Sequence, residues 1–389
     1  MAGPLEGVRV VELGLWVAGP AAGGVLADWG ADVVKIEPPG GDPARTLAAM
    51  YGGDLASNPP FEMDNRSKRS IVLDLGREDD RETARALADD ADVFITNMRG
   101  SALTRFGVDH ETLRARNPRL VYGWITGYGV DGPDADRPAY DIAAFWSRSG
   151  IAHLLSGRGE PPPGQRSGMG DHLTGMSLAS GICAALVARA RTGEGQLVTT
   201  SLFRQGTYTV SIDVNTYLMW GLTIGTSRRD RMANPCINNY LAADGRRFWV
   251  VGLEGNRHWP PMCRILGRPD WLEDARYATA AARAQNAVEL IREIDAIFAT
   301  RPLEEWTEVF ATEPEFFWAP VNSLEDLLAD KQFHAGGGVV EVPDGGATTP
   351  MAATPVDFGG TPWAPRSMAP DIGEHTDEIL AELAARRLR

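Results

Sequence analysis

Strand and helix patterns alternate along the first 130 residues, and this alternation is the feature that most restricts the fold. Short apolar, β-branched runs are separated by stretches in which apolar residues recur at helical spacing. The predicted strands lie at 8–13, 31–37, 70–75, 93–97, 120–126 and 195–203, and the predicted helices at 20–30, 79–91, 110–117 and 172–193. Strands separated by helices form βαβ units, so we expect an α/β fold with a mostly parallel sheet.

The pattern changes near residue 225. Residues 238–253 predict an antiparallel hairpin with Asp244 and Gly245 at its turn. Helical stretches follow to about residue 312, which indicates a second, smaller α+β unit over about 225–320. The Pro- and Gly-rich segment 335–372 is interpreted as an ordered linker, and a helix is predicted from about residue 375.

Composition excludes several classes of protein. The chain has 389 residues, 43% of them apolar and 23% charged, which is typical of a globular protein with more than one domain. No apolar run approaches the roughly 20 residues of a membrane helix, and the N-terminal sequence lacks the layout of a secretory signal. We therefore expect a cytoplasmic protein with no membrane partner. The net charge of −14 argues against nucleic acid as a partner but not against a phosphorylated small molecule.

Neither a metal nor a tightly bound cofactor is expected. Three cysteines and six histidines show none of the spacings that typify zinc sites or disulfide frameworks. The glycine-rich stretch "GLWVAGPAAGG" (14–24) joins the first predicted strand to the first helix, but it lacks the GxGxxG pattern of dinucleotide-binding loops. Its glycines indicate either close packing of strand on helix or backbone contacts to a nucleotide-bearing ligand.

Basic residues gather near the predicted strand ends, where open α/β sheets bind their ligands. Two interpretations stay open: solvated surface charges, or a shared pocket for an anion such as phosphate. The residues concerned are Lys35, Arg45, Arg66, Lys68, Arg69, Arg99 and Arg105.

The stretch "SGMGDHLTG" (167–175) places Gly168 and Gly170 before an acid that opens a predicted helix. One interpretation makes Asp171 the N-cap of that helix. The other makes it an accessible nucleophile, kept ionised by the helix N-terminus and freed from steric blocking by the two glycines. Asp141 alone is interpreted as the cap of a buried helix over 140–150, and Glu254 as a turn residue after an apolar strand.

Several stretches in the same order resemble the class III CoA-transferases, the CaiB/BaiF family that includes formyl-CoA transferase and α-methylacyl-CoA racemase. The matching stretches include "PLEGVRVVEL", "AGP" at 18–20, "LADWGADVVKIEPPGGDPAR", "NRSKRSIVLDL", "ADVFITNMRG", "SGMGDHLTGM", "GEGQLVTTSLF" and "GEHTDEIL". The resemblance implies an interlocked homodimer. Each subunit would have a large Rossmann-like CoA-binding domain over 1–224, a small α+β domain over 225–320, and a linker and C-terminal return to the large domain over 321–389.

The resemblance also implies an activity and a set of site residues. Members move CoA from an acyl-CoA to a free carboxylic acid, with CoA as a substrate. The family's catalytic aspartate matches Asp171 in the dipeptide Gly170-Asp171, and Glu254 resembles a glutamate near the active site. The residues that match the CoA site by motif position are Val17, Ala18, Leu73, Asn97, Met98, Arg99, Arg105 and Asp141, with Arg45 in place of an arginine that relatives carry at Pro38.

Two alternatives to CoA transfer stay open. The racemase branch has a histidine before the acid that matches Asp141, whereas this chain has Tyr140, so the racemase proton pair is not carried over. A non-catalytic CoA-binding protein is the other alternative, although it would not need Asp171. In the transferase, Asp171 would form an acyl anhydride and then a CoA thioester, with backbone N–H groups near 168–171 holding the oxyanion. We also hypothesise a dry wall that selects bulky acyl groups, built from Phe145, Trp146, Tyr217 and Trp220.

Overall fold

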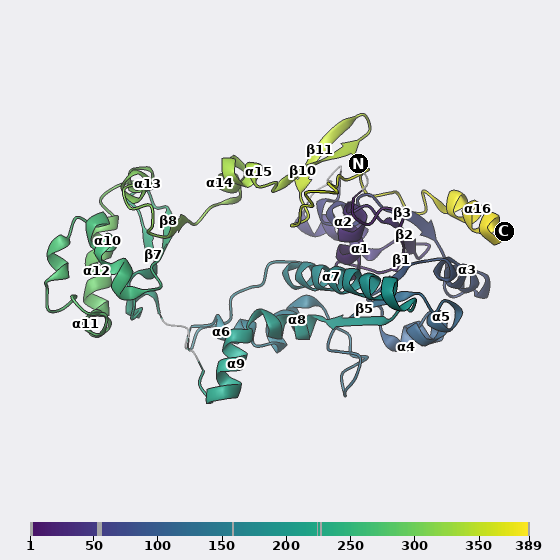
Figure 1. Ribbon diagram of the computed structural model, residues 1–389, viewed down its shortest axis with the longest axis horizontal. Helices are drawn as coiled ribbons and strands as arrows, with labels where there is room; N and C mark the ends of the chain where they lie inside the picture. The colour runs from purple at the N-terminus through teal and green to yellow at the C-terminus, as the bar shows by residue number, and fades with distance from the viewer. Residues whose placement is uncertain (1–2, 53–56, 158, 224, 226–227, 388–389) are drawn as a thin grey trace. The chain divides into compact units, whose positions relative to one another are not determined.

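A computed structural model describes residues 3–52, 57–157, 159–223, 225 and 228–387 of the chain. The chain divides into two compact units, whose elements are labelled in Figure 1. The large unit comprises Met1–Leu155, Pro162–Ile224 and His334–Arg389, and the small unit comprises Ser156–Pro161 and Gly225–Phe333. The large unit is therefore built from segments on both sides of the small unit in the sequence.

A six-stranded parallel sheet forms the centre of the large unit, in the order β3-β2-β1-β4-β5-β6. Its strands are β1 (Arg9–Leu13), β2 (Asp32–Glu37), β3 (Arg69–Val72), β4 (Val93–Thr96), β5 (Val121–Thr126) and β6 (Leu197–Ser201). This is the strand order of doubly wound nucleotide-binding folds, so the predicted Rossmann-like parallel sheet is confirmed. The order reverses between β1 and β4, and ligands of such sheets bind beyond the carboxyl ends of the strands at that point.

Continuous apolar runs form these strands because helices cover both faces of the sheet. Every residue of β4 is buried, as are the last four residues of β1. Two charged residues interrupt the runs: Glu12 in β1 lies opposite Lys35 in β2, and their side chains form a fully buried ion pair of 3.0 Å.

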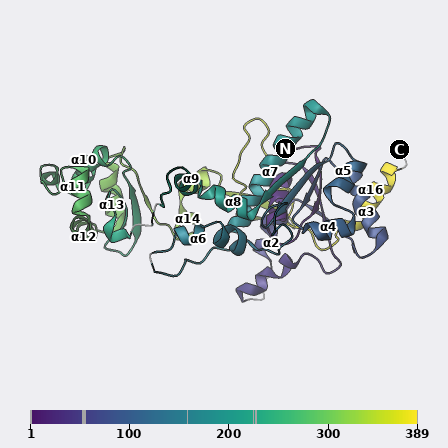
Figure 2. The ribbon, with the colours of Figure 1, turned by 90° about the horizontal axis from the view of Figure 1, so that it is seen from below.

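Helices of the large unit pack on the two faces of the sheet (Figure 2). The helices of this unit are α1 (Ala18–Asp28), α2 (Pro59–Asn65), α3 (Glu78–Asp89), α4 (Gly100–Phe106), α5 (His110–Arg116), α6 (Ile151–Leu154), α7 (Met169–Thr192), α8 (Leu202–Thr209), α9 (Ser211–Trp220) and α16 (Thr376–Arg387), with a 3-10 helix η1 (Pro43–Tyr51) and a π-helix η2 (Ile142–Arg148). One apolar cluster joins the sheet to α1 and α7, and another joins it to α3, α5 and α16.

The longest helix, α7, starts close to Asp171 as predicted and ends at Gly193, whose φ of 78° closes the helix. It is the single helix among the described residues with the length and hydropathy to cross a membrane, a property that the sequence analysis missed. It packs against α1, β5 and β6, and Leu178, Ala179 and Ile182 lie in the core. We therefore interpret α7 as a core helix whose outer face is exposed in the single chain.

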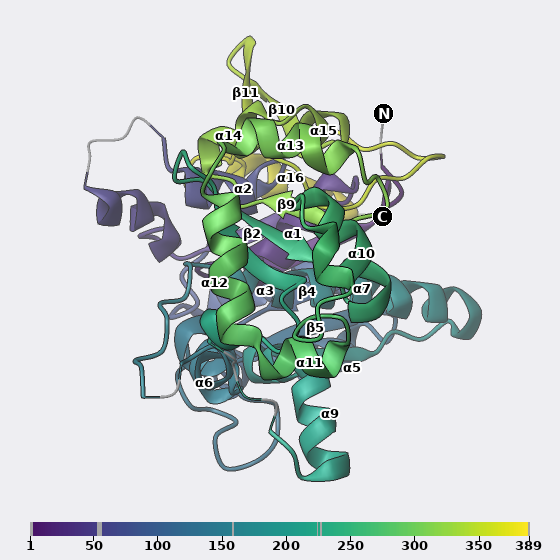
Figure 3. The same ribbon diagram turned by 90° about the vertical axis from the view of Figure 1, so that its left-hand side faces the viewer.

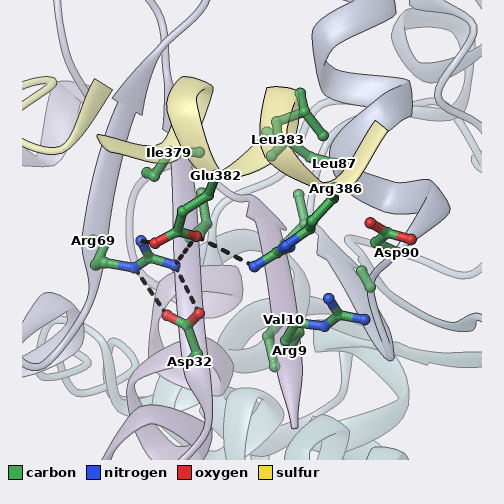
Figure 4. A pocket seen from close by; sticks show the side chains of 13 residues that line it. Arg9, Val10, Asp32, Arg69, Leu87, Asp90, Ile379, Glu382, Leu383 and Arg386 are labelled. Atoms are coloured by element: carbon green, nitrogen blue, oxygen red, sulfur yellow. Dashed lines mark hydrogen bonds and ion pairs between the residues drawn. The ribbon is translucent and has the colours of Figure 1, made fainter. Parts of the chain in front are cut away.

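The C-terminal helix α16 packs on the sheet beside α3, through Ile379 and Leu383. Figure 4 shows the polar side of this contact, where Arg69 of β3 donates to Asp32 of β2 and to Glu382 of α16. The cavity at this contact has a volume of about 20 Å³, which is room for about one water molecule. The ion pairs and the apolar contact together attach α16 to the large unit.

The segment predicted as an ordered linker contains a β-hairpin that the sequence analysis missed. It consists of β10 (Val339–Asp344) and β11 (Ala347–Ala352), paired antiparallel. Gly345 and Gly346 both have positive φ, which gives the tight two-residue turn.

The small unit is an α+β structure with its own core (Figure 3). Its antiparallel sheet consists of β7 (Ile237–Leu241), β8 (Arg247–Val251) and β9 (Trp318–Pro320). The β7–β8 hairpin confirms the prediction for 238–253, with Gly245 at φ 80°. Its helices are η3 (Arg229–Arg231), α10 (Gly255–Ile265), η4 (Pro269–Leu272), α11 (Ala280–Gln285), α12 (Ala287–Phe298), α13 (Leu303–Ala311) and α14 (Leu324–Ala329), and α15 (Lys331–Ala335) leads back to the large unit.

Candidate active site

The first turn of α7 carries the carboxylate of Asp171. Gly168 occupies the N-cap position with φ 74°, a conformation that favours glycine, and Asp171 is the third residue of the helix. The interpretation of Asp171 as the N-cap is therefore wrong. Asp171 is half-buried, and it has no salt bridge among the residues that the structure describes.

Gly170 is required by close packing. A Cβ at position 170 would lie 2.4 Å from Cγ of Phe145, which is fully buried in η2. A π-helix is rare and is often found at functional sites. The predicted buried helix over 140–150 is thus a π-helix that packs against the backbone leading into Asp171.

Burial, and then the negative charge of Asp141, raises the pKa of Asp171 from 3.8 to about 7. The charge of Asp64 adds to this rise, and that of His172 opposes it. The helix N-terminus is expected to keep this carboxylate ionised, but loss of hydration and two nearby carboxylates outweigh the helix dipole and raise its pKa. At neutral pH about half of the molecules hold Asp171 ionised.

Asp141 lies directly before η2 and is bound to the same turn. Its carboxylate accepts hydrogen bonds from backbone N–H groups of Ile142, Gly170 and Gly168, and from Nε2 of Gln165 at 2.9 Å. Burial nevertheless raises the pKa of Asp141 on balance. The N–H groups of Gly168 and Gly170, predicted as oxyanion donors for Asp171, are directed to Asp141 in this structure.

The loop after β1 lies beside this turn. The ring of Trp16, a residue with φ 65°, meets the exposed ring of Tyr140 edge to face at 5.8 Å. Val17 lies next to Gly168, with its Cγ1 3.8 Å from the place of a Cβ on that glycine. Ala18 is the buried first residue of α1. The structure therefore brings Val17, Ala18, Tyr140, Asp141, Gly170 and Asp171 together.

The loop after β4 is joined to the same region. Asn97 accepts from the backbone N–H of Leu15 at 3.0 Å and donates to the Leu15 carbonyl at 2.7 Å. Met98 follows, and its carbonyl accepts from Nε1 of Trp124 at 2.9 Å. Arg99 is the exposed N-cap of α4. The carboxyl edge of the sheet thus carries Asn97, Met98 and Arg99 near the loop that leads to Val17.

Three other predicted residues lie in different surroundings. Leu73 is buried directly after β3, and Arg105 is exposed on α4 with its guanidinium 4.8 Å from the Phe106 ring centroid. Glu254 lies in the small unit, at the exposed start of α10, 3.2 Å from Arg257. Its relation to Asp171 stays a prediction.

Most of the basic residues proposed to form an anion pocket are paired with carboxylates. Lys35, Arg66 and Lys68 are also buried, so the hypothesis is wrong for these three, whereas it stays a prediction for Arg45 and Arg69. Arg45 forms two hydrogen bonds to Glu37, at 2.8 and 2.7 Å, and a third to the Pro370 carbonyl. The other pairs are Lys35 with Glu12 and Asp42, Lys68 with Glu12, Arg66 with Asp28, and Arg69 with Asp32. Arg99 and Arg105 are the members of the group that stay exposed, at the start and in the last turn of α4.

The buried charges support the glycine-rich loop. Lys35 also donates to the Gly14 carbonyl at 2.9 Å, and Lys68 donates to the Pro20 carbonyl at 2.9 Å. Asp42 accepts from the backbone N–H of Trp16 at 3.0 Å. These interactions fix both ends of the loop over residues 14–20, a role that the sequence analysis did not find. A lysine inside an otherwise apolar strand, as in "VVKIE", is the signal that indicates such a buried pair.

The proposed aromatic wall is not a single feature. Phe145 and Trp146 are buried in η2, whereas Tyr217 and Trp220 are 61% and 70% exposed on α9.

Among the described residues, no group of three or more His, Cys, Asp or Glu side chains could hold a metal ion.

Comparison with known proteins identifies the family. The family described as CoA-transferase family III matches residues 5–376. The (R)-2-hydroxy-4-methylpentanoate CoA-transferase of Clostridioides difficile is 32% identical over 382 residues, which covers 97% of this chain and 95% of that protein. The succinate–glutarate CoA-transferase of Agrobacterium fabrum is 36% identical over 399 residues, which covers 98% of this chain and 96% of that protein.

Solved structures agree with this assignment. A CaiB/BaiF family protein from Brucella suis superposes with a TM-score of 0.86 at 32% identity, covering 98% of this chain and 100% of that one. The protein Rv3272 from Mycobacterium tuberculosis superposes with a TM-score of 0.83 at 28% identity, covering 97% of this chain and 98% of that one. With a family match over residues 5–376 and relatives aligned over nearly the full chain, the protein belongs to CoA-transferase family III, the CaiB/BaiF family, and is a transferase enzyme.

Proposed function

We propose that this enzyme moves CoA from an acyl-CoA donor to a free carboxylic acid, with Asp171 as the nucleophile. The observation that carries the proposal is the placement of a half-buried, unpaired carboxylate on the first turn of α7, next to the loops at the carboxyl edge of the parallel sheet. A pKa near 7 leaves a large ionised fraction at neutral pH and makes that carboxylate more nucleophilic than an ordinary aspartate.

The reaction proceeds through three covalent states of Asp171: a mixed anhydride with the donor acid, a CoA thioester and a mixed anhydride with the acceptor acid. A carboxylate oxygen of Asp171 attacks the thioester carbonyl, the carbon–sulfur bond breaks, and CoA thiolate leaves a mixed anhydride. The thiolate then attacks Cγ of Asp171, the donor acid leaves as a carboxylate, and an aspartyl-CoA thioester remains. The acceptor carboxylate attacks this thioester and releases the thiolate. Attack of the thiolate on the acceptor carbonyl forms the new acyl-CoA and restores Asp171.

Both anhydride states require that the CoA thiolate stay bound in the site. We assign the CoA contacts to the loops that follow β1, β3 and β4. Arg99, at the start of α4, and Arg105, in its last turn, have exposed side chains, so they are proposed to hold the phosphates of CoA. Val17, Ala18, Leu73, Asn97 and Met98 would contact the rest of the CoA molecule, while Arg45, already paired with Glu37, would act by supporting the loop after β2.

We further propose a cytoplasmic homodimer. α7 and α9 carry large apolar side chains that the single chain leaves exposed, which is typical of a face covered by another protein. These residues are Leu173, Val187, Ile212, Leu218, Met219 and Trp220, between 40% and 77% exposed. Light scattering after size exclusion should give twice the mass of the chain, and a monomer would contradict this part of the proposal.

Relatives of this chain act on acids of several kinds, so the acids are to be found by a panel. Purified enzyme is incubated with each acyl-CoA donor and each free acid, among them branched 2-hydroxy, aryl and dicarboxylic acids. Transfer that disappears in Asp171→Ala, with the fold retained, supports the proposal. Full transfer by Asp171→Ala would contradict it.

Two further assays with the same acyl-CoA compounds distinguish CoA transfer from racemisation and from binding without catalysis. A racemase would exchange the α-hydrogen of a 2-methylacyl-CoA for deuterium in heavy water without needing an acceptor acid. A CoA-binding protein without activity would bind acyl-CoA and turn over none of it. Transfer without such exchange supports the transferase.

A further inference from the structure

We propose that Asp64 holds His172 as an imidazolium and that His172 is a positioning residue, whose charge keeps the neighbouring Asp171 ionised. The proposal rests on the function proposed above. It assigns a role to two residues, Asp64 and His172, that the motif comparison does not place in the site.

The geometry of the pair is that of a charged hydrogen bond. Nε2 of His172 lies 3.0 Å from Oδ1 of Asp64. Asp64 is in the last turn of α2 and is 3% exposed, while the His172 side chain keeps 40% of its surface exposed. A carboxylate as buried as Asp64 needs a partner, and a half-exposed imidazole can exchange protons with water.

The second ring nitrogen of His172 faces the turn at Gly168. The place of a Cβ on Gly168 lies 3.3 Å from Nδ1 of the ring, and the Gly168 backbone is among the groups that raise the pKa of His172. An imidazolium can donate from both nitrogens, to Asp64 and to the Gly168 backbone, whereas a neutral ring can donate from one. Although burial lowers the pKa of His172, the hydrogen bond and charge of Asp64 raise it above its ordinary value on balance.

The pair acts on Asp171 by charge. Residues next to each other on a helix do not face one another, so His172 offers Asp171 an opposite charge rather than a hydrogen bond. Without this cation, Asp171 would be left with two carboxylates, Asp141 and Asp64, both of which disfavour its ionised form. Lys68 also interacts with Asp64, although it donates to Glu12 and to Asn65.

No other described charge on the elements that pack against α7 takes this role. Asp28 on α1 is paired with Arg66, and Arg148 on η2 is paired with Asp134. Arg204 on α8 is exposed. His172 is therefore the one described cation to which the ionisation of Asp171 is directly coupled.

The pH profile of kcat/KM for CoA transfer tests this role. In the unaltered enzyme the rate should rise with pH through about 7, as Asp171 ionises. In His172→Gln this limb should move upward by about one pH unit, so transfer at pH 6 falls by about tenfold more than at pH 9. Asp64→Asn removes a carboxylate that disfavours ionised Asp171 as well as the partner of His172, so the limb should move less in that variant. His172→Lys keeps a cation, so its limb should lie closer to that of the unaltered enzyme than the limb of His172→Gln does. His153→Gln, an exposed histidine on α6, is the matched control and should leave the limb in place.

A second measurement does not depend on activity. Carbon-13 labelled histidine lets the ring of His172 be titrated by magnetic resonance, assigned by its loss in His172→Gln. Its pKa should lie above the ordinary value and fall in Asp64→Asn. If the protein transfers no CoA but His172 titrates in this way, the proposed function fails and the pair stands. An unshifted limb in His172→Gln, or a His172 pKa at or below its ordinary value, overturns the proposal.

Discussion

The ring of Phe145 occupies the space that any side chain at position 170 would need, with its Cγ 2.4 Å from the place of a Cβ on Gly170. Because Asp171 is the next residue, a shift that relieves this clash moves the proposed nucleophile. The π-helix that carries Phe145 and the turn that carries Asp171 are thus one packed unit.

Gly170→Ala should therefore lose most of its activity. We expect a fall in kcat/KM of at least about 100-fold, since displacement of a catalytic group by about 1 Å costs that much. The free energy of unfolding should fall by about 1–3 kcal/mol through overpacking. Steady-state kinetics measures the fall in kcat/KM, and urea unfolding measures the change in the free energy of unfolding. Gly164→Ala is the control, since a Cβ there meets no atom within 4 Å. Equal activity in the two variants would contradict the packing argument.

Asp171→Asn should stabilise the fold while abolishing transfer. The pKa of Asp171 rises from 3.8 to about 7 on folding, so between these pH values the folded protein holds a proton that the unfolded chain releases. Stability therefore falls as pH rises through that window. Asparagine does not ionise, so the variant should gain about 1–3 kcal/mol at pH 8 and little at pH 4.

Urea unfolding of both proteins at pH 4, 6 and 8 measures this difference. Asp131→Asn is the control, because Asp131 is exposed and should change stability equally little at each pH. A gain for Asp171→Asn that does not grow with pH would contradict the raised pKa.

Glu12→Gln should destabilise the large unit. Glu12 accepts from Lys35 at 3.0 Å and from Lys68 at 2.7 Å, and all three side chains are fully buried. Loss of the carboxylate leaves the buried ammonium group of Lys68 without an ion pair among the described residues and leaves Lys35 with Asp42 alone, at a cost of about 3–5 kcal/mol. Glu6→Gln, at an exposed glutamate, should cost less than about 0.5 kcal/mol. Similar midpoints of unfolding for the two variants would show that the buried charges matter little.

Arg99→Ala and Arg105→Ala should weaken acyl-CoA binding. Each exposed guanidinium is proposed to contact a phosphate, so KM for acyl-CoA should rise by about tenfold with kcat nearly unchanged. The double variant should also show a weaker dependence of KM on salt. Arg191→Ala, at the far end of α7, is the control. Unchanged KM in both variants would place the phosphates elsewhere.

The large sheet was predictable because its strands are apolar runs between amphipathic helices, as in β4 and α3. The β10–β11 hairpin was missed because its residues alternate weakly and include Pro343 and Pro350, which disfavour strands. The π-helix after Asp141 could not be predicted, since its single extra residue per turn leaves no clear periodicity.

The candidate site also contains residues that the sequence could predict and residues that it could not. Packing requires a glycine at position 170, and the backbone of Leu15 binds the amide of Asn97, so their residue types are tied to the local structure. The role of Asp171 is predicted from motif position and stays a proposal. The Asp64–His172 pair joins residues 108 positions apart, and the Glu12–Lys68 pair joins residues 56 apart. Contacts over such distances in the chain leave no local pattern, so the sequence showed the charges without their partners.

Covalent trapping of the enzyme tests the central claim most directly. The protein is incubated with acyl-CoA, treated with hydroxylamine or borohydride, digested, and analysed by mass spectrometry. The account predicts modification at Asp171, dependent on acyl-CoA and absent in Asp171→Asn. Modification at another residue, or transfer activity with an unmodified Asp171, would contradict it.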